Sequence, residues 1–382
     1  MCSSEWNDHV LVEERAGLRI LVLNRARQLN ALSYPMIHRM LESFLAYEHD
    51  PSVQLIVLKG NGRAFCAGGD VAAVVHGISN ANWQLGAEFF RKEFTLNYVM
   101  ATYSKPQVSI LNGIVMGGGA GASMHGRFRV ATENTVFAMP ETALGLFPDV
   151  GASYFLSRLP GFFGEYVGLT GTRLDGVEML HCGLATHFIP SKMLLLLEDE
   201  LSKISSSNCT SIDAYAEILD AFSERPTLKR HSAYHRLNFI NWCFSLRTVE
   251  EILLALENES RKRKDNWIEA TIQSLRNASP TSLKISLKSI REGRLQGVGQ
   301  CLSREYRMVC HVMRGKFSKD FYEGCRAILL DKDKNPKWEP SELEDVHDTI
   351  VEQYFAKIDD VEWDELSLPR RYNLPTSVVA KL

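Results

Sequence analysis

The chain has 382 residues, a hydrophobic fraction of 45% and a formal net charge of −3. This length predicts two domains, and the hydrophobic fraction is typical of a globular protein with a sizeable core. The slight acidic excess argues against a nucleic-acid-binding protein, which normally carries a strong basic excess. No run of about 18 apolar residues is present, so the sequence predicts no membrane-spanning helix.

The first half of the chain predicts strands that alternate with a helix. Two aliphatic runs, 10–14 and 19–23, are separated by Ala16-Gly17 and predict a hairpin. Ser33 can cap a helix that begins near Pro35. The apolar residues of that helix follow helical spacing: Ile37, Met40, Leu41, Phe44 and Leu45.

Two further apolar runs, 53–58 and 107–111, predict buried strands. The order strand, strand, helix, strand predicts an α/β fold without a simple parallel βαβ repeat. After about residue 190 the strand signal fades, and helical patterns dominate. The sequence therefore predicts a core over residues 1–203 and a mainly helical region over 204–382.

Several local signals mark the helical region. Thr248 and Glu251 have the spacing of a capping box, and Ser279-Pro280 predicts a helix start. Gly293 can close that second helix. The stretch 205–211, rich in Ser, Asn and Thr, predicts a linker or long loop.

The eight cysteines include no C-x-x-C pair, which predicts single buried thiols in a reducing compartment. The first residues show neither an apolar signal core nor an Arg-rich leader. The chain ends in Ala380-Lys381-Leu382, a close variant of the Ser-Lys-Leu address that the peroxisomal import receptor reads. We therefore expect the protein in the peroxisomal matrix, with that receptor as a partner.

Three segments carry the residues that indicate chemistry. Glycines that follow a strand let main-chain N–H groups approach a ligand without a Cβ in the way. A helix that starts within Gly117–Gly119 would favour an anion at its first turn. Phosphate binding or a plain tight turn are the alternatives, and the G-x-G-x-x-G dinucleotide fingerprint is absent. The three segments are 64–70 (AFCAGGD), 112–121 (NGIVMGGGAG) and 137–151 (FAMPETALGLFPDVG).

Two such loops could each direct one N–H at the same carbonyl oxygen and form an oxyanion hole. Glu141 and Asp149, eight positions apart, are the acids beside this predicted site. The alternative for Glu141 is a charge at a helix N-terminus, and for Asp149 a cap of a helix over 151–159. Cys66 has no histidine neighbour in sequence and is interpreted as a packing residue. Serine-hydrolase and zinc motifs are absent.

In this order, the three segments resemble the crotonase superfamily. The run 140–151 resembles its 3-hydroxyisobutyryl-CoA hydrolase branch, and the likeness extends from 23–32 to 331–338. Together with the chain end, it resembles the plant peroxisomal members. The resemblance implies an α/β (α+β) fold of repeated ββα units with two roughly perpendicular sheets, followed by a long helical region.

The resemblance also implies roles for individual residues. The N–H groups of Ala67 and Gly118 would form the oxyanion hole, and Glu93 would contact the substrate. A solvated face of a helix over 83–100 is the alternative for Glu93. Enoyl-CoA hydratases carry one of their two glutamates at the position of Gly121, so hydratase activity should be weak or absent.

The implied activity is hydrolysis of the thioester of 3-hydroxyisobutyryl-CoA, and of 3-hydroxypropionyl-CoA, in valine catabolism. Glu141 either attacks the carbonyl or activates water, and Asp149 binds the substrate hydroxyl. No cofactor or metal is expected, because CoA is part of the substrate. The alternatives are an enoyl-CoA hydratase or isomerase, and a non-catalytic acyl-CoA-binding protein.

The sequence is compatible with alternatives for the basic loop near the chain end and for the oligomeric state. Three lysines could meet the CoA phosphates or form a solvated basic loop: Lys332, Lys334 and Lys337. Members of the superfamily are frequently trimers, so a homo-oligomer is an alternative to a monomer, although the long helical half could cover its own surface.

Overall fold

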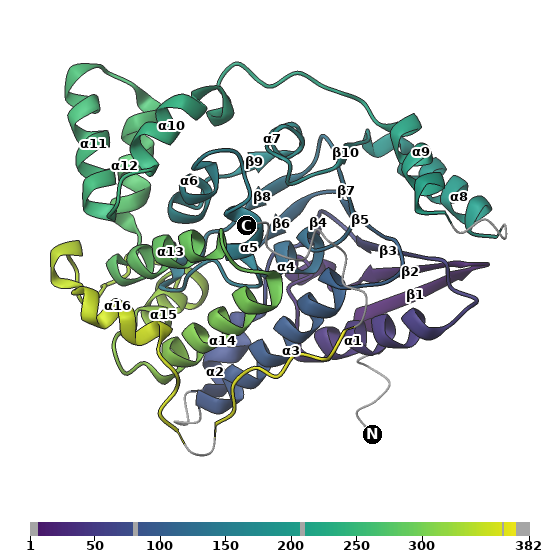
Figure 1. Cartoon of the computed structure of the whole chain (residues 1–382), viewed down its shortest axis with the longest axis horizontal. Coiled ribbons are helices and arrows are strands. Elements are labelled where there is room, and N and C mark those ends of the chain that lie inside the picture. Colours follow the sequence, from purple (N-terminus) through teal and green to yellow (C-terminus); the bar gives the residue numbers. More distant parts are fainter. Residues whose placement is uncertain (1–6, 79–82, 207–210, 361–362, 372–382) are drawn as a thin grey trace.

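The computed structural model describes residues 7–78, 83–206, 211–360 and 363–371. Strands and helices alternate up to residue 188, and the described residues beyond it form helices and loops (Figure 1). The mixed α/β fold with a helical C-terminal region is therefore confirmed. In the described part of the chain, no helix is long and apolar enough to cross a bilayer.

The strands form two sheets. The larger has the order β1-β2-β3-β5-β7-β10, and the smaller has the order β4-β6-β8-β9. The strands of the larger sheet are β1 (Val10–Arg15), β2 (Leu18–Leu23), β3 (Leu55–Gly60), β5 (Gln107–Leu111), β7 (Phe128–Ala131) and β10 (His187–Phe188). Those of the smaller sheet are β4 (Ala64–Cys66), β6 (Ile114–Met116), β8 (Val136–Ala138) and β9 (Leu174–Asp175).

In several successive strand pairs, the two strands belong to different sheets. In the pairs β3/β4, β5/β6 and β7/β8, the first strand joins the larger sheet and the second joins the smaller one. Helices follow the β1/β2, β3/β4 and β5/β6 pairs, which gives the repeated ββα pattern. The predicted hairpin is confirmed as the antiparallel pair β1/β2. The predicted strand 107–111 coincides with β5, whereas that over 53–58 begins two residues later, at Leu55.

Both faces of the larger sheet are covered. Along β2, Leu21 and Leu23 point into one apolar cluster, while Leu18, Ile20 and Val22 point into another. This alternation follows from the two-residue side-chain period of a strand. Helices α8 (Leu194–Ser205) and α9 (Ile212–Phe222) cover the second face through Leu197, Leu201, Tyr215 and Leu219.

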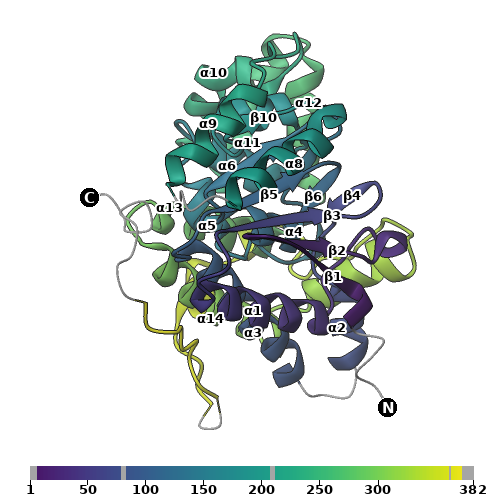
Figure 2. The ribbon, with the colours of Figure 1, turned by 90° about the vertical axis from the view of Figure 1, so that its right-hand side faces the viewer.

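The helices of the first half are α1 (Tyr34–His49), α2 (Val71–Ile78), α3 (Trp83–Ala101), α4 (Gly118–Met124), α5 (Ala152–Leu156), α6 (Phe163–Thr170) and α7 (Gly176–Cys182). Those that follow are α8 (Leu194–Ser205), α9 (Ile212–Phe222), α10 (Leu237–Phe244), α11 (Val249–Lys262), α12 (Asn266–Asn277), α13 (Pro280–Gly293), α14 (Val298–Arg314), α15 (Asp320–Cys325) and α16 (Asp348–Phe355). Helix α14 packs against α3, and α13 packs against α5 and α6, so this late part of the chain folds back onto the first half (Figures 1 and 2).

Local signals in the sequence fix several of these boundaries. The capping box of Thr248 and Glu251 opens α11, and Ser279 caps α13. Ser33 occupies the N-cap position of α1, but its hydroxyl makes no capping hydrogen bond. The predicted linker 205–211 begins at Ser205, the last residue of α8, and ends just before α9; residues 207–210 of it fall outside the described residues. The division into 1–203 and 204–382 stays a prediction.

Candidate active site

The loop that follows β4 is fastened to the segment 24–32. The side-chain amide of Asn30 donates to the carbonyl oxygens of Asn61 (2.9 Å) and Ala64 (2.8 Å). The guanidinium of Arg25 lies 3.1 Å from the carboxylate of Asp70, at the far end of the loop. These side chains hold both ends of the segment 64–70.

One predicted donor on this loop is already engaged. The N–H of Ala67 donates to the carbonyl oxygen of Leu29 at 3.0 Å. An N–H has a single proton to donate, so this group is not free for a ligand. The prediction that Ala67 supplies an oxyanion donor is therefore wrong in this structure.

The neighbouring N–H of Gly69 faces the other way. On either side of it, Gly68 O accepts from the N–H of Leu32 and the N–H of Asp70 donates to Leu32 O, both at 2.8 Å. In an extended segment, alternate main-chain groups point to opposite sides, so the Gly69 N–H points away from Leu32. A Cβ built on Gly118 would lie 2.8 Å from Gly69 N, which places the two glycine loops side by side.

The second glycine loop leads directly into α4. Gly117 has φ +48°, a left-handed conformation that glycine adopts readily, and α4 begins at Gly118. The first N–H groups of a helix have no partner within the helix. A Cβ on Gly117 would come within 2.9 Å of Glu141 Oε1, and one on Gly118 within 2.5 Å of Glu93 Oε1. The glycines thus let the main chain approach two acids.

The three predicted acids are all buried. Glu93, on α3, has 1% of its surface exposed, Glu141 at the start of the 3₁₀ turn η3 (Glu141–Leu144) has 5%, and Asp149 has 3%. The alternative interpretation of Glu93 as part of a solvated helix face is therefore wrong. Two of their oxygens, Glu93 Oε1 and Glu141 Oε2, have no hydrogen-bond partner among the described residues.

Burial changes the proton affinity of all three acids. It raises the pKa of Glu93 to about 8 and that of Glu141 to about 8, the charge of Glu93 adding to the effect on Glu141. Burial also raises the pKa of Asp149 well above its usual value, and the charges of Glu93 and Glu141 raise it further. Glu141 and Glu93 lie against the adjacent residues Gly117 and Gly118, and Val150, next to Asp149, lies against Gly121 of the same helix, so the three acids lie around one segment.

Asp149 lies on a turn that leads into α5. Val150 and Gly151 both have positive φ, and Gly151 is the N-cap residue of α5. The carboxylate that accepts the first N–H groups of this helix belongs to Glu305 of α14, not to Asp149. The alternative role of Asp149 as a helix cap is therefore excluded. Glu305 was not predicted, because its distance from Asp149 in the sequence leaves no local signal.

The remaining predicted residues lie as follows. Cys66 is buried with its Sγ 3.5 Å from Gly68 O, and burial raises the pKa of its thiol to about 12, as expected of a packing residue. Gly121 lies on α4, where its Cα faces Val150. The loop lysines follow the π-helical turn 326–330 and are exposed: Lys332, Lys334 and Lys337.

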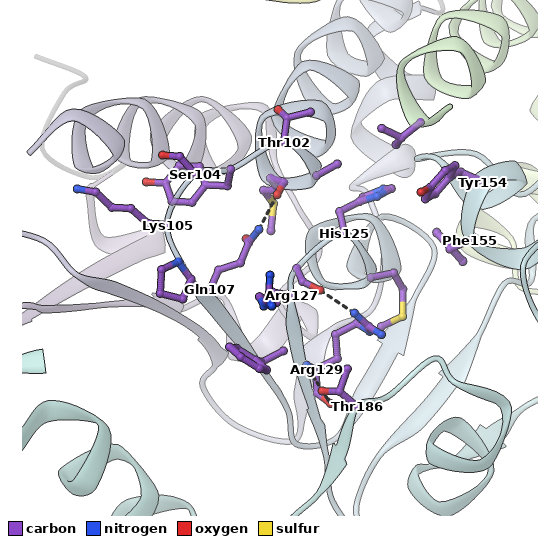
Figure 3. Close-up of a pocket in the computed structure, with 18 of the residues that line it drawn as sticks. Thr102, Ser104, Lys105, Gln107, His125, Arg127, Arg129, Tyr154, Phe155 and Thr186 are labelled. Carbon is purple, nitrogen blue, oxygen red and sulfur yellow. Dashed lines mark hydrogen bonds between the residues drawn. The ribbon is translucent and has the colours of Figure 1, made fainter. Parts of the chain in front are cut away.

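A large cavity lies elsewhere in the molecule. Its volume is about 1430 Å³, and it is lined at the N-terminal ends of β5 and β7 by residues such as Gln107, Arg127 and Arg129 (Figure 3). His125, at the end of α4, forms part of its wall. None of the three acids belongs to the lining. The site of the acids is therefore distinct from this cavity.

Comparison with known proteins places the chain among CoA-thioester enzymes. Residues 18–355 match the family described as enoyl-CoA hydratase/isomerase. The chain is 69% identical to 3-hydroxyisobutyryl-CoA hydrolase 1 of Arabidopsis thaliana, across 98% of this chain and 97% of the relative. It is 65% identical to probable 3-hydroxyisobutyryl-CoA hydrolase 3 of the same plant, across 98% of each.

A solved structure agrees with this assignment. The carnitinyl-CoA dehydratase from Mycobacterium thermoresistibile superimposes with a TM-score of 0.84 and 35% identity, covering 94% of this chain and 99% of that one. The chain therefore belongs to the enoyl-CoA hydratase/isomerase family, within the branch of the 3-hydroxyisobutyryl-CoA hydrolases. The family resemblance seen in the sequence is confirmed.

Proposed function

We propose that the protein hydrolyses the thioester of 3-hydroxyisobutyryl-CoA to 3-hydroxyisobutyrate and CoA, and acts on 3-hydroxypropionyl-CoA in the same way. The observation that carries this proposal is the burial of Glu141 and Asp149 beside the two glycine loops, in a chain 69% identical to a curated hydrolase of that name. The reaction belongs to valine catabolism.

The thioester carbonyl binds between the two glycine loops. The N–H groups of Gly118 and Gly69 donate to its oxygen. Gly69 takes the place of Ala67, whose N–H is already bonded to Leu29 O. As the carbonyl carbon becomes tetrahedral, its oxygen gains negative charge, which the two donors stabilise. Loss of one such donor typically lowers the rate by about 10²–10³-fold.

Glu141 begins the cleavage. Its ionised carboxylate attacks the carbonyl carbon, the C–S bond breaks, and the CoA thiolate leaves and takes up a proton. Water then cleaves the resulting mixed anhydride, which releases the hydroxy acid and restores Glu141. In the alternative route, Glu141 removes a proton from the water that attacks the thioester. Repeated turnover in ¹⁸O-water separates the routes, since only the anhydride route places label in Glu141.

Asp149 recognises the substrate. Its carboxylate accepts a hydrogen bond from the 3-hydroxyl group and then assists the water of the second step. Burial and the charges of Glu93, Glu141 and Glu305 raise the pKa of Asp149, and a hydrogen bond from the bound hydroxyl would stabilise its ionised form.

Gly121 disfavours the rival reaction. Adding water to a 2-enoyl-CoA requires two acids that transfer protons, and glycine at this position provides none. A release assay for free thiol on purified protein tests the proposal directly. We expect turnover of 3-hydroxyisobutyryl-CoA and little or no hydration of crotonyl-CoA. Hydration in the absence of thiol release would contradict it.

The protein acts in the peroxisomal matrix. The tripeptide Ala380-Lys381-Leu382, which lies outside the described residues, supports recognition by the import receptor. A fluorescent protein fused to the N-terminus of the chain should co-localise with a peroxisomal marker. Deletion of the tripeptide should leave the fusion in the cytosol, and continued import would contradict this localisation.

A further inference from the structure

The turn that carries Asp149 has an unfavourable backbone conformation. Val150 has φ +54°, and Gly151 follows with φ +82°. A β-branched residue such as valine rarely adopts the left-handed region, because its side chain crowds the main chain there. Such a conformation persists only when neighbouring groups hold it. Two side chains from distant parts of the sequence do so here.

The first is His125, at the C-terminal end of α4. Its Nε2 lies 2.7 Å from the carbonyl oxygen of Val150. Burial lowers the pKa of His125 to about 4, so the ring is neutral at ordinary pH. A carbonyl oxygen only accepts hydrogen bonds, and Nε2 must therefore carry the proton. The ring also lies against Gly151, where a Cβ would come within 2.5 Å of His125 Cε1.

The second is Glu305, on α14, which is completely buried. Its Oε2 accepts from the N–H of Gly151 at 2.6 Å, and its Oε1 accepts from the N–H of Ser153 at 2.9 Å. The hydroxyl of Ser153 also donates to Oε1. The guanidinium of Arg304 donates to that hydroxyl at 2.7 Å and to Ser289 O at 2.9 Å. Glu305 is thus anchored to α13 and fixes the first turn of α5.

We propose that Glu305 and His125 are positioning residues that hold the turn 149–151 and thereby direct the Asp149 carboxyl group at the substrate hydroxyl. The inference rests on the proposed role of Asp149 in hydroxyl recognition. His125 fixes the carbonyl side of Val150, and Glu305 fixes the N–H of the next residue. The peptide unit between Val150 and Gly151 is therefore held from both ends.

The acids around Asp149 come from three elements. They are Glu93 on α3, Glu141 on η3 and Glu305 on α14, and the charge of each raises the pKa of Asp149. Glu305 itself faces Arg304, whose charge opposes the effect of burial on Glu305. Removal of the Glu305 charge should therefore let Asp149 ionise at lower pH.

A comparison of two substrates distinguishes a positioning role from a general effect on protein stability. Isobutyryl-CoA has the same acyl skeleton as 3-hydroxyisobutyryl-CoA but lacks the hydroxyl group. The ratio of kcat/KM for the two substrates therefore measures hydroxyl recognition. Asp149→Asn tests the proposed function and should lower this ratio by roughly tenfold or more. Glu305→Gln keeps the shape of the side chain but places its NH₂ group against a main-chain N–H, which is also a donor. This variant should lower the ratio to a similar extent.

The pH dependence distinguishes the two positioning residues. In Glu305→Gln, the ratio of kcat/KM for the two substrates, in which the ionisation of Glu141 cancels, should begin to rise at lower pH than in the wild type, because one negative charge that acts on Asp149 is gone. His125→Phe removes the hydrogen bond to Val150 without changing the charge at neutral pH. This variant should lower the ratio without moving the pH at which the ratio rises. It also tests the inference should Glu305→Gln fail to fold.

Glu198→Gln serves as a matched control. Glu198, on α8, is also buried, and its Oε2 lies 2.9 Å from Nζ of Lys59. This variant should keep the wild-type ratio at temperatures where thermal unfolding shows that it is folded. If Asp149→Asn loses hydroxyl recognition while folded Glu305→Gln and His125→Phe retain it, the inference is overturned and the proposed function stands. If Asp149→Asn also retains it, both fall.

Discussion

The β-carbon of Val150 occupies the space that a side chain at position 121 would need. A Cβ built on Gly121 would lie 2.6 Å from the Cβ of Val150 and 3.0 Å from Nδ2 of Asn97. The turn that brings Asp149 into the buried site therefore excludes an acid from α4. The resemblance to the hydratases implies a glutamate at this position in those enzymes, and here the Cβ of Val150 leaves no room for one.

This relationship predicts the effect of restoring a side chain at position 121. Gly121→Ala should lower the free energy of unfolding by about 1–3 kcal/mol, because it overpacks a filled site. Gly121→Glu should lose hydrolase activity without gaining hydration of crotonyl-CoA. Urea unfolding and both assays check this, with Gly126→Ala as a control whose Cβ would lie at least 3.3 Å from its neighbours. Full stability together with new hydratase activity would contradict the account.

The pH dependence of turnover follows from the buried acids. Glu141 must be ionised to attack or to act as a base, and burial raises its pKa to about 8. It is therefore mostly protonated in the empty site at pH 6 and mostly ionised at pH 9. We expect kcat/KM to rise across this interval, with an apparent pKa near 8. A rate that is constant from pH 5 to pH 9 would exclude this role.

The same shift predicts how stability responds to neutralising Glu141. A carboxyl group whose pKa is higher in the folded state than in the unfolded state binds more protons when folded. Stability therefore falls as pH rises between the two values, here from about 4.5 to about 8. Glu141→Gln removes this loss and should raise the melting temperature relative to wild type more at pH 8 than at pH 5. If the difference in melting temperature were the same at pH 5 and pH 8, burial would not raise the pKa of Glu141.

Asn30 should matter to both stability and rate. Its amide donates to two carbonyl oxygens, and its Oδ1 accepts from the N–H of Arg25 at 2.8 Å. Asn30→Ala should cost about 1–3 kcal/mol of stability, since it leaves buried main-chain groups unpaired. Because this side chain fastens the loop that carries Gly69, kcat should also fall. Gln54→Ala, which removes an exposed hydrogen bond to Pro51 O, should change neither property measurably.

Local patterns predicted the elements and motifs well, because they depend on neighbouring residues. The hairpin, β5 and the cap at Thr248 follow from side-chain alternation and capping spacing alone. The N–H of Gly69, which we propose as the second main-chain donor, does not follow from such patterns. It depends on Leu29, whose carbonyl accepts the Ala67 N–H and leaves the Gly69 N–H to face the other loop.

Contacts between distant segments account for the other differences. The first N–H groups of α5 are accepted by Glu305, 154 residues after Gly151, and no local signal points to this pairing. Burial of Glu93 likewise depends on the glycine loop that packs over α3. Helical periodicity alone places a glutamate on a face but does not show what covers that face.

The rate of thiol release by folded Glu141→Gln tests the central claim most directly. With 3-hydroxyisobutyryl-CoA in single turnover, we expect the rate of release to fall by about 10²–10⁴-fold. An amide can neither attack the thioester nor accept a proton from water. Binding of the substrate should persist. Release of CoA at the wild-type rate by this variant would show that another group cleaves the thioester.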